Sequence, residues 1–386
     1  MTKYTTVFTS LLRYLSTSEF QNAICGFKAD RRSRKLTTWD MFKVMLYGQL
    51  CGCFSVREII GSMKANSTRL YHAGLKSVKR STFCDAMEKR NSDIFQSVFH
   101  LLSEKAQLIA GNTKKKFKDP LRIIDSSTIS LCLSKFDWAK YRTTKGAVKL
   151  HMNLDGDSLI PLNAYISDGK LHDVNAMHWL CEESGVIYVL DRGYVDFKSL
   201  YCIELQGSKF VTRMKSNCTY KKIKSYSEHS DCPVIADIEI ELTGNKTKEK
   251  YPRHLRKVRY HDKEYNRIYE FLTNDFELSA QEIADIYKER WQVELFFKWI
   301  KQHLKVKTFW GTSRNAVFSQ IWVALIGSIL LWICRTLEGI KTSPYELLTM
   351  MRTTLLTKGS ITEISNRDYS PPPLDTSQPF LEGLSC

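Results

Sequence analysis

The spacing of apolar residues changes near residue 120, and this change constrains the fold more than any other feature. Before it, apolar residues recur at helical intervals, for example in residues 41–50 and 56–65. After it, short runs rich in β-branched residues alternate with helical segments, and these runs are residues 121–129, 149–154, 159–166, 186–190 and 209–213. Strands that give way to alternating helices and strands are typical of a mixed α/β sheet. We therefore expect an all-α domain followed by an α/β domain.

The α/β part is expected to contain an insertion and a long helix. Residues from about 216 to 272 are again rich in strand-forming residues, which indicates a β-rich insertion. One long helix is predicted from about 280 to 304, and an apolar helix over 316–336. The apolar run within the second helix, residues 321–334, is too short for a comfortable membrane span, so we expect a buried core helix. The predicted domains are residues 1–118, 119–345 and 346–386, the last being a C-terminal helix and tail.

The first domain contains a candidate helix-turn-helix. A short helix is predicted over 67–73, where Gly74 can end it in the left-handed conformation. The next helix is expected to begin at Ser81 or Thr82, which are suitable N-cap residues. A helical bundle with a solvated basic face is the alternative interpretation. The candidate DNA contacts are the two residues that precede this helix, Lys79 and Arg80.

The charge distribution points to a polyanionic partner. The net charge is +16, and residues 1–120 contain 21 Lys and Arg against 9 Asp and Glu. Basic side chains gain affinity for DNA by displacing counterions from its phosphates, so the first domain is expected to bind nucleic acid. The 11 cysteines are scattered without paired zinc-site spacing, which favours reduced thiols in the cytoplasm.

Two aspartates stand at the ends of predicted strands. Asp125 interrupts the run 121–129, and Asp191 directly follows the run 186–190. The carboxyl edge of a central strand is where α/β sheets bind ligands. Each aspartate alone is better explained as a turn or helix cap. On neighbouring strands, however, the two would repel each other unless a cation lay between them.

Four polar residues share one side of the predicted long helix. At about 100° per residue, they fall within an arc of about 60° that borders the apolar face, and they are Tyr287, Arg290, Glu294 and Lys301. An ion-pair ladder on a solvated face is the alternative. Arg290 preceding Glu294 is the weaker orientation for such a pair, and Trp291 is unusual beside a surface ladder. We therefore interpret this stripe as part of a functional site.

The spacing of these four residues, Tyr-x2-Arg-x3-Glu-x6-Lys, resembles the signature of bacterial cut-and-paste transposases of the insertion-sequence-four family. The strand with Asp125, the segment around Asp191 and the β-rich stretch before Glu294 fit the same family, over about residues 120 to 335. The resemblance implies a ribonuclease H-like catalytic domain with Asp125, Asp191 and Glu294 as its triad. These carboxylates would hold two Mg²⁺ ions, with Mn²⁺ as a substitute.

The resemblance also implies how DNA ends are handled. In this family the ends are nicked, closed into hairpins, reopened and joined to target DNA. The residues that match its DNA contacts are Tyr287, Arg290, Trp291, Lys301 and Arg213. Relatives have a base-stacking tryptophan in the β insertion, whereas this chain has none between 216 and 286, and Tyr269 is the matching residue. The alternative for Tyr269 is a packed strand residue.

The expected function is therefore DNA transposition. The implied partners are double-stranded DNA, as terminal inverted repeats and as target, and a second copy of the chain in a homodimer, with no membrane. The helix near 344–356 is the expected dimer contact, and the nucleoid of the bacterial cytoplasm is the expected location. Two alternatives remain open: a DNA-binding protein or repressor with a vestigial catalytic domain, and a structure-specific nuclease.

Overall fold

The computed structural model describes residues 5–365, apart from residues 32, 34, 112–115, 143, 144, 228–232, 265, 305 and 307. The predicted C-terminal tail, after residue 365, lies outside the described residues. Within them, ten strands form one mixed sheet in the order β2-β3-β1-β5-β6-β10-β9-β8-β7, with β4 paired to β3. The strands are β1 (Leu121–Leu131), β2 (Lys140–Arg142), β3 (Lys145–Asp155), β4 (Pro161–Asp168), β5 (Ile187–Leu190), β6 (Lys209–Arg213), β7 (Tyr220–Ser227), β8 (Val234–Leu242), β9 (Leu255–Asp262) and β10 (Arg267–Thr273).

Five strands of this sheet have the topology of the ribonuclease H fold. β1, β5 and β6 are parallel to one another, and β3 lies antiparallel between β1 and β4, which gives the order β4-β3-β1-β5-β6. Helix α8 (Asp173–Leu180) connects β4 to β5, and α9 (Phe197–Leu205) connects β5 to β6. The predicted ribonuclease H-like α/β fold is confirmed.

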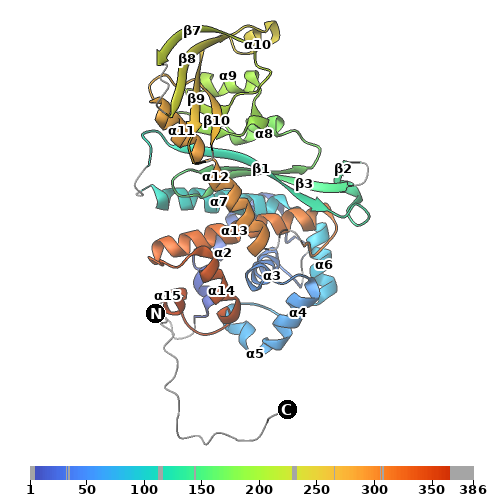
Figure 1. Ribbon diagram of the computed structural model, residues 1–386. Coiled ribbons are helices and arrows are strands. Elements are labelled where there is room, and N and C mark those ends of the chain that lie inside the picture. The colour runs from blue at the N-terminus through green and yellow to red at the C-terminus, as the bar shows by residue number, and fades with distance from the viewer. Residues whose placement is uncertain are drawn as a thin grey trace, which may run out of the picture.

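The β-rich segment continues the same sheet. β10 pairs with β6, and β9, β8 and β7 follow outwards, so these strands stand at the top of Figure 1, beyond β1 and β3. The sequence analysis missed β7 and the short α10 (Asn245–Lys250). β7 is an edge strand, and edge strands tolerate charges that obscure the apolar pattern of a strand. Three lysines within Tyr220–Ser227 have this effect.

Alternate residues of the central strands supply two separate cores. In β5, Ile187 and Val189 join the core on one face, while Tyr188 and Leu190 join the core on the other. Helices α8 and α9 cover the second face through residues such as Met177 and Leu200. A strand that is buried on both faces lacks the alternation of apolar and polar residues. This burial explains why residues 187–190 read as a continuous apolar run.

The helices of the N-terminal region, together with the two C-terminal helices, pack around the long apolar helix α13 (Arg314–Leu337). The rings of Phe99 and Trp322 lie 5.2 Å apart, and the Gln49 side chain donates a hydrogen bond to the Gln320 carbonyl. These helices, in the lower half of Figure 1, are α1 (Val7–Leu12), α2 (Thr17–Ile24), α3 (Thr38–Cys51), α4 (Val56–Ala65), α5 (Ser67–Leu70), α6 (Arg80–Lys89), α7 (Asp93–Ala110), α14 (Pro344–Thr354) and α15 (Ile361–Ser365). They share one continuous apolar core with α13 and one face of the sheet.

α13 is long and apolar enough to cross a membrane, but 94% of its most apolar window is buried within the protein. The apolar run of residues 321–334 lies at the centre of this 24-residue helix, which was predicted over 316–336. Its burial against α3 and α7 confirms the prediction of a core helix.

Two predicted helix boundaries are wrong. α6 begins at Arg80, with Lys79 at its N-cap, and not at Ser81 or Thr82. No side chain caps it, so burial of Phe83 and Met87, rather than capping, determines where this helix lies. The preceding elements agree with the helix-turn-helix prediction, since a 3₁₀ turn after α5 ends at Gly74 with a left-handed φ of 62°.

The single helix predicted over 280–304 is also wrong. The chain forms α11 (Ala280–Lys288) and α12 (Trp291–His303), separated by a turn at Glu289 and Arg290. At the turn the Arg290 N–H donates to the Tyr287 carbonyl, three residues earlier. Both turn residues keep right-handed φ and ψ angles, so the periodicity of side chains hardly changes. The predicted stripe is therefore divided between two helices.

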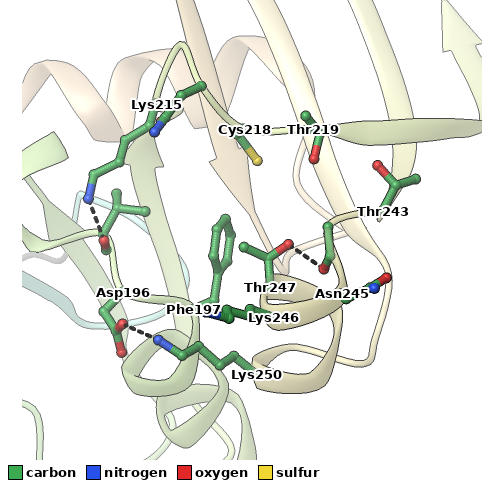
Figure 2. A pocket seen from close by; sticks show the side chains of 13 residues that line it. Asp196, Phe197, Lys215, Cys218, Thr219, Thr243, Asn245, Lys246, Thr247 and Lys250 are labelled. Carbon is green, nitrogen blue, oxygen red and sulfur yellow. Dashed lines mark hydrogen bonds and ion pairs between the residues drawn. The ribbon is translucent and has the colours of Figure 1, made fainter.

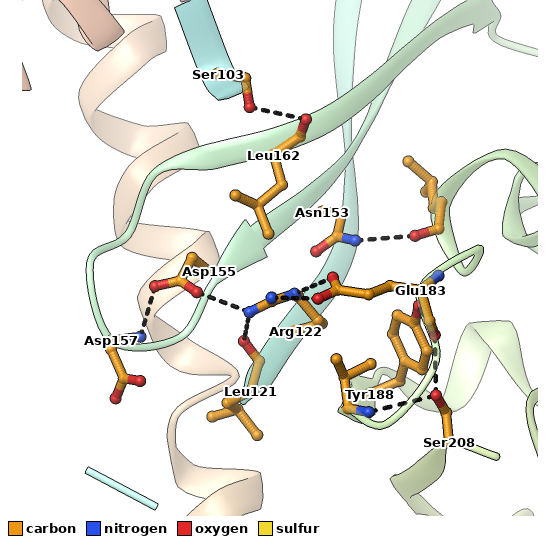
Figure 3. Close-up of polar contacts among 12 residues, drawn as sticks. Ser103, Leu121, Arg122, Asn153, Asp155, Asp157, Leu162, Glu183, Tyr188 and Ser208 are labelled. Carbon is orange, nitrogen blue, oxygen red and sulfur yellow. Dashed lines mark hydrogen bonds and ion pairs between the residues drawn. The ribbon is translucent and has the colours of Figure 1, made fainter. Parts of the chain in front are cut away.

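An ionic network around the buried side chain of Arg122 fixes the start of β1 (Figure 3). Arg122 donates two hydrogen bonds to Glu183, at 2.6 and 2.7 Å, and one to Asp155 of β3 at 2.7 Å. Ser208, which precedes β6, donates to the carbonyl of Glu183. The network ties β1 to β3 and to the segments before β5 and β6. It therefore holds the register of β1, which contains Asp125, and of β5, which Asp191 follows.

Candidate active site

Asp125 and Asp191 lie side by side at the centre of the sheet. Ile124 of β1 pairs with Leu190 of the parallel β5, so the residue after each of them is an aspartate at the same level. Oδ1 of Asp125 accepts a hydrogen bond from the backbone of Ser126 at 2.7 Å. Oδ2 of Asp191 accepts one from the backbone of Gly193 at 3.3 Å. The strand register therefore brings these two carboxylates together.

Glu294 on α12 is joined to Asp125 through Arg290. Nη1 of Arg290 donates to Oδ2 of Asp125 at 3.0 Å, and Nη2 donates to Oε1 of Glu294 at 2.5 Å. The side chains of Arg290 and Asp125 are each only 16% exposed. The guanidinium thus offsets the repulsion between two carboxylates. A cavity of about 420 Å³ opens here, lined by Asp125, Ser126, Ser127, Glu294, Phe297, Lys298, Lys301 and Gln302.

These carboxylates have the chemistry of a divalent cation site. Burial raises the pKa of Asp125 to about 6; Arg290 acts to lower it, while the negative charges of Asp191 and Glu294 raise it. Among the described residues no three His, Cys, Asp or Glu side chains converge closely enough to hold a metal ion, and Arg290 instead joins two of the carboxylates. All three candidates offer hard oxygen donors, and a cation would relieve the same repulsion as the guanidinium. The donor chemistry of the three residues therefore suits a hard divalent ion, while Arg290 pairs with two of them in this structure.

Asp125→Asn is expected to stabilise the metal-free protein by roughly 1–3 kcal/mol at pH 7. Because the pKa is about 6 in the folded protein and 3.8 for an ordinary aspartate, the charged carboxyl makes the fold less stable above pH 6. The destabilising contribution of Asp125 should therefore shrink as pH falls from 7 to 5, and the advantage of the variant over the parent should shrink with it. Urea unfolding of the parent and of the variant, in the presence of a chelator at pH 7 and at pH 5, measures the difference in stability at each pH. A variant no more stable than the parent at pH 7 would contradict this reasoning.

Other predicted site residues line a second cavity, of about 680 Å³, beside Arg290. Tyr269 of β10 stacks on Phe271 with ring centroids 5.9 Å apart, and Arg213 at the end of β6 lies 5.3 Å from the Tyr269 centroid. The hydroxyl of Tyr287 is buried and makes no hydrogen bond of ordinary geometry with the described residues. Trp291 is 57% exposed at the rim. This cavity is therefore rich in aromatic rings, and its lining combines basic side chains such as Arg213 with acidic ones such as Asp285.

The remaining predicted residues lie in different places. Lys301 lines the carboxylate cavity, and its Nζ donates to the carbonyl of Thr128 in β1 at 2.9 Å. Lys79 and Arg80 lie at the start of α6 in the helical part, where both are exposed. They line neither of the two cavities. Eight of the eleven predicted residues thus line these two cavities, Asp191 lies beside Asp125, and Lys79 and Arg80 lie apart.

The sequence analysis missed a polar cluster beside the two aspartates. Asp173, the first residue of α8, accepts a hydrogen bond from Ser126 at 2.6 Å and forms an ion pair with Lys149 at 3.2 Å. An aspartate at the start of a helix is common, since it interacts favourably with the helix dipole. The sequence therefore contained nothing that separated Asp173 from an ordinary helix start.

A third cavity, of about 660 Å³, lies between the start of α9 and α10 (Figure 2). It contains none of the three carboxylates. Two of its lysines are already engaged, since Lys215 donates to the Val195 carbonyl and Lys250 pairs with Asp196 at 3.5 Å. The chemistry of the site therefore lies in the two cavities that adjoin Arg290.

Comparison with known proteins identifies two regions. Residues 116–330 match the family described as the transposase DDE domain, and residues 3–76 match a domain of unknown function. A protein described as a probable transposase for insertion sequence element IS5377 of Geobacillus stearothermophilus is 30% identical over 86% of this chain and 86% of its own length. A candidate transposase, y4zB of Sinorhizobium fredii, is 35% identical over 66% of this chain and 71% of its own.

Among solved structures, a piggyBac transposase synaptic complex with hairpin DNA aligns with 96% of this chain and 83% of that chain, at a TM-score of 0.49 and 11% identity. The family match covers the strands and helices that contain Asp125, Asp191 and Glu294, and extends into α13. The chain therefore belongs to the transposase DDE domain family and is a DNA transposase of the insertion-sequence type.

Proposed function

We propose that this transposase cuts and joins DNA at the terminal inverted repeats of its own insertion sequence, with Asp125, Asp191 and Glu294 as the catalytic carboxylates. The observation that carries this proposal is the pairing of Ile124 with Leu190, which sets the two aspartates side by side. The link from Asp125 through Arg290 to Glu294 supports the third member. Asp125 and Glu294 thus line one cavity, and the strand register sets Asp191 beside Asp125.

DDE transposases depend on divalent metal ions, and we propose Mg²⁺ here, with Mn²⁺ as a substitute. When bound, two such ions activate the attacking hydroxyl group and stabilise the leaving oxygen at phosphorus. Asp125, Asp191 and Glu294 would hold the ions through their carboxylate oxygens, and Arg290 would then be free to hold a DNA phosphate, which a guanidinium can bind with two hydrogen bonds. Lys298 and Lys301 add positive charge along the same cavity. This arrangement orients one phosphodiester for an in-line displacement.

The aromatic cavity fits a base displaced from the end of the DNA. Hairpin closure requires a sharply bent strand, and an unstacked base needs an aromatic partner. Tyr269 supplies such a ring next to Arg213, and Trp291 lies at the entrance. We propose that Tyr269 stacks on this base while Tyr287 and Arg213 contact the neighbouring phosphates.

Tyr269→Ala is expected to slow hairpin closure about 10- to 100-fold, because stacking of a base on an aromatic ring is worth about 1–3 kcal/mol. The first nick should proceed at the parent rate, and Tyr269→Trp should restore closure. Nick and hairpin products are separated on denaturing gels. Tyr226→Ala is the control, since Tyr226 is exposed on β7 and lines neither cavity near Arg290. Equal loss of both products would instead indicate a packing defect.

We propose that the helical part recognises the ends and that two copies act together. Lys79 and Arg80 are exposed at the start of α6, and Tyr71 in the preceding turn is 86% exposed. Basic and aromatic side chains on a helix-turn-helix suit contacts with phosphates and bases. The exposed apolar side chain of Tyr345 within α14 supports that helix as the dimer contact. Light scattering of the protein bound to DNA ends measures the number of copies.

The direct test uses duplex fragments that carry the two ends of the DNA element encoding this chain. With Mg²⁺, the transposase should cut these ends and join them to a second DNA, and scrambled ends should remain intact. Cutting regardless of end sequence would instead identify a structure-specific nuclease. Sequence-specific binding without any cutting would identify a repressor with a vestigial catalytic domain.

A further inference from the structure

A fourth carboxylate, Asp173, lies next to the proposed catalytic residues but belongs to another element. Its Oδ1 accepts a hydrogen bond from Oγ of Ser126 at 2.6 Å, and Ser126 in turn donates its backbone N–H to Oδ1 of Asp125. Asp173 is thus one residue removed from Asp125. The connection runs from the start of α8 to the end of the apolar part of β1.

The second oxygen of Asp173 faces the loop after Asp191. A Cβ built on Gly193 would lie 3.8 Å from Oδ2 of Asp173 and 3.7 Å from Oδ2 of Asp191. Gly193 also donates its N–H to that same oxygen of Asp191. Asp173 therefore bonds to the residue beside Asp125 and leaves little space next to the loop that follows Asp191.

Buried side chains hold Asp173 in this place from behind. Lys149 of β3 lies 3.2 Å from Oδ1, and it also donates to the carbonyl of Leu171. His151, which is fully buried, lies 3.6 Å from the same oxygen, and its other nitrogen contacts Ser167 at 3.0 Å. Oδ1 of Asp173 is thus directed toward β1 and β3 and away from the backbone of α8. A residue that served only to begin the helix would not need these partners.

We propose that Asp173 is a positioning residue of the active site, which holds Ser126 and the Gly193 loop so that Asp125 and Asp191 face the same metal position. This inference rests on the proposed function of those two aspartates. Removing a residue that orients the ligands of a metal commonly lowers the affinity for the metal 10- to 100-fold.

The test measures Mn²⁺ affinity by electron paramagnetic resonance on the full chain without DNA, beside urea unfolding. Asp173→Ala and Ser126→Ala should each weaken Mn²⁺ binding at least about tenfold. The double variant should be little weaker than either one, because both act through the same hydrogen bond. Asp173→Asn keeps an acceptor oxygen for Ser126 and should recover most of the affinity. Asp93→Asn is the control, since Asp93 is also the first residue of a helix and is exposed far from the site.

Each outcome separates this inference from the proposed function. If Asp173→Ala binds Mn²⁺ as tightly as the parent while Asp191→Asn does not, Asp173 has no positioning role and the proposed function stands. Additive losses in the double variant, or an affinity loss in Asp173→Asn as large as in Asp173→Ala, would also overturn the inference. If Asp191→Asn itself binds Mn²⁺ like the parent, the proposed function fails, and the inference fails with it.

Discussion

Replacing Asp191 with asparagine is expected to reduce Mg²⁺-dependent cleavage of the DNA ends by at least about 10³-fold, which corresponds to about 4 kcal/mol. Asp191 lies beside Asp125 because β1 and β5 are in parallel register, and asparagine has the same shape without the charge. The fold should be retained, since Asp191 is partly exposed and an amide oxygen still accepts the hydrogen bond from Gly193. Binding to the DNA ends should remain within a few-fold of the parent.

The matched control is Asp168→Asn. Asp168 also ends a strand of the same sheet, β4, but it is exposed and lines neither cavity that adjoins Arg290. Cleavage products on denaturing gels and end binding in gel-shift experiments measure the two effects separately. Cleavage by Asp191→Asn at a rate near that of the parent would remove this residue from the catalytic site. A parallel loss of end binding would point to misfolding and not to chemistry.

Much of the α/β fold could be predicted because its strands are buried on both faces. Residues 187–190 form a continuous apolar run, and a run this short with flanking turns is typical of a central strand. The two aspartates follow from the same pattern, since each interrupts or ends such a run. Sequence alone left the cap and ligand interpretations open. The pairing of Ile124 with Leu190 is a long-range contact that no local pattern reports.

The break between α11 and α12 could not be predicted for a different reason. Glu289 and Arg290 keep right-handed backbone angles, and neither Gly nor Pro marks the turn. Helical periodicity therefore continues through the break, although the hydrogen bonds change to the tighter i,i+3 pattern. The consequence is functional, because the turn places Arg290 between two cavities. Asp173 escaped prediction because its partners come from β1 and β3, 47 and 24 residues away along the chain.

Arg290 is expected to affect metal binding and cleavage in opposite directions. In the protein without DNA its guanidinium pairs with Asp125 and Glu294, so it competes with a cation for the same oxygens. Arg290→Gln should therefore bind Mn²⁺ several-fold more tightly, because two carboxylates lose their only shared partner among the described residues. The unpaired carboxylates should also lower the stability of the metal-free protein, since removing one partner leaves buried charge.

Cleavage by Arg290→Gln should nevertheless fall about 10²- to 10³-fold, which is the usual cost of removing one group that stabilises charge in the transition state. Arg253→Gln is the control, because it makes the same change at an arginine that is 56% exposed and lines neither cavity that adjoins Arg290. Mn²⁺ titrations and single-turnover cleavage at saturating Mn²⁺ separate the two effects. Weaker Mn²⁺ binding would show that Arg290 orients the carboxylates and does not compete for them. Cleavage at the parent rate would show that the guanidinium never reaches the phosphate. Tighter metal binding with slower cleavage is the combination that only an arginine shared between the carboxylates and the DNA can produce.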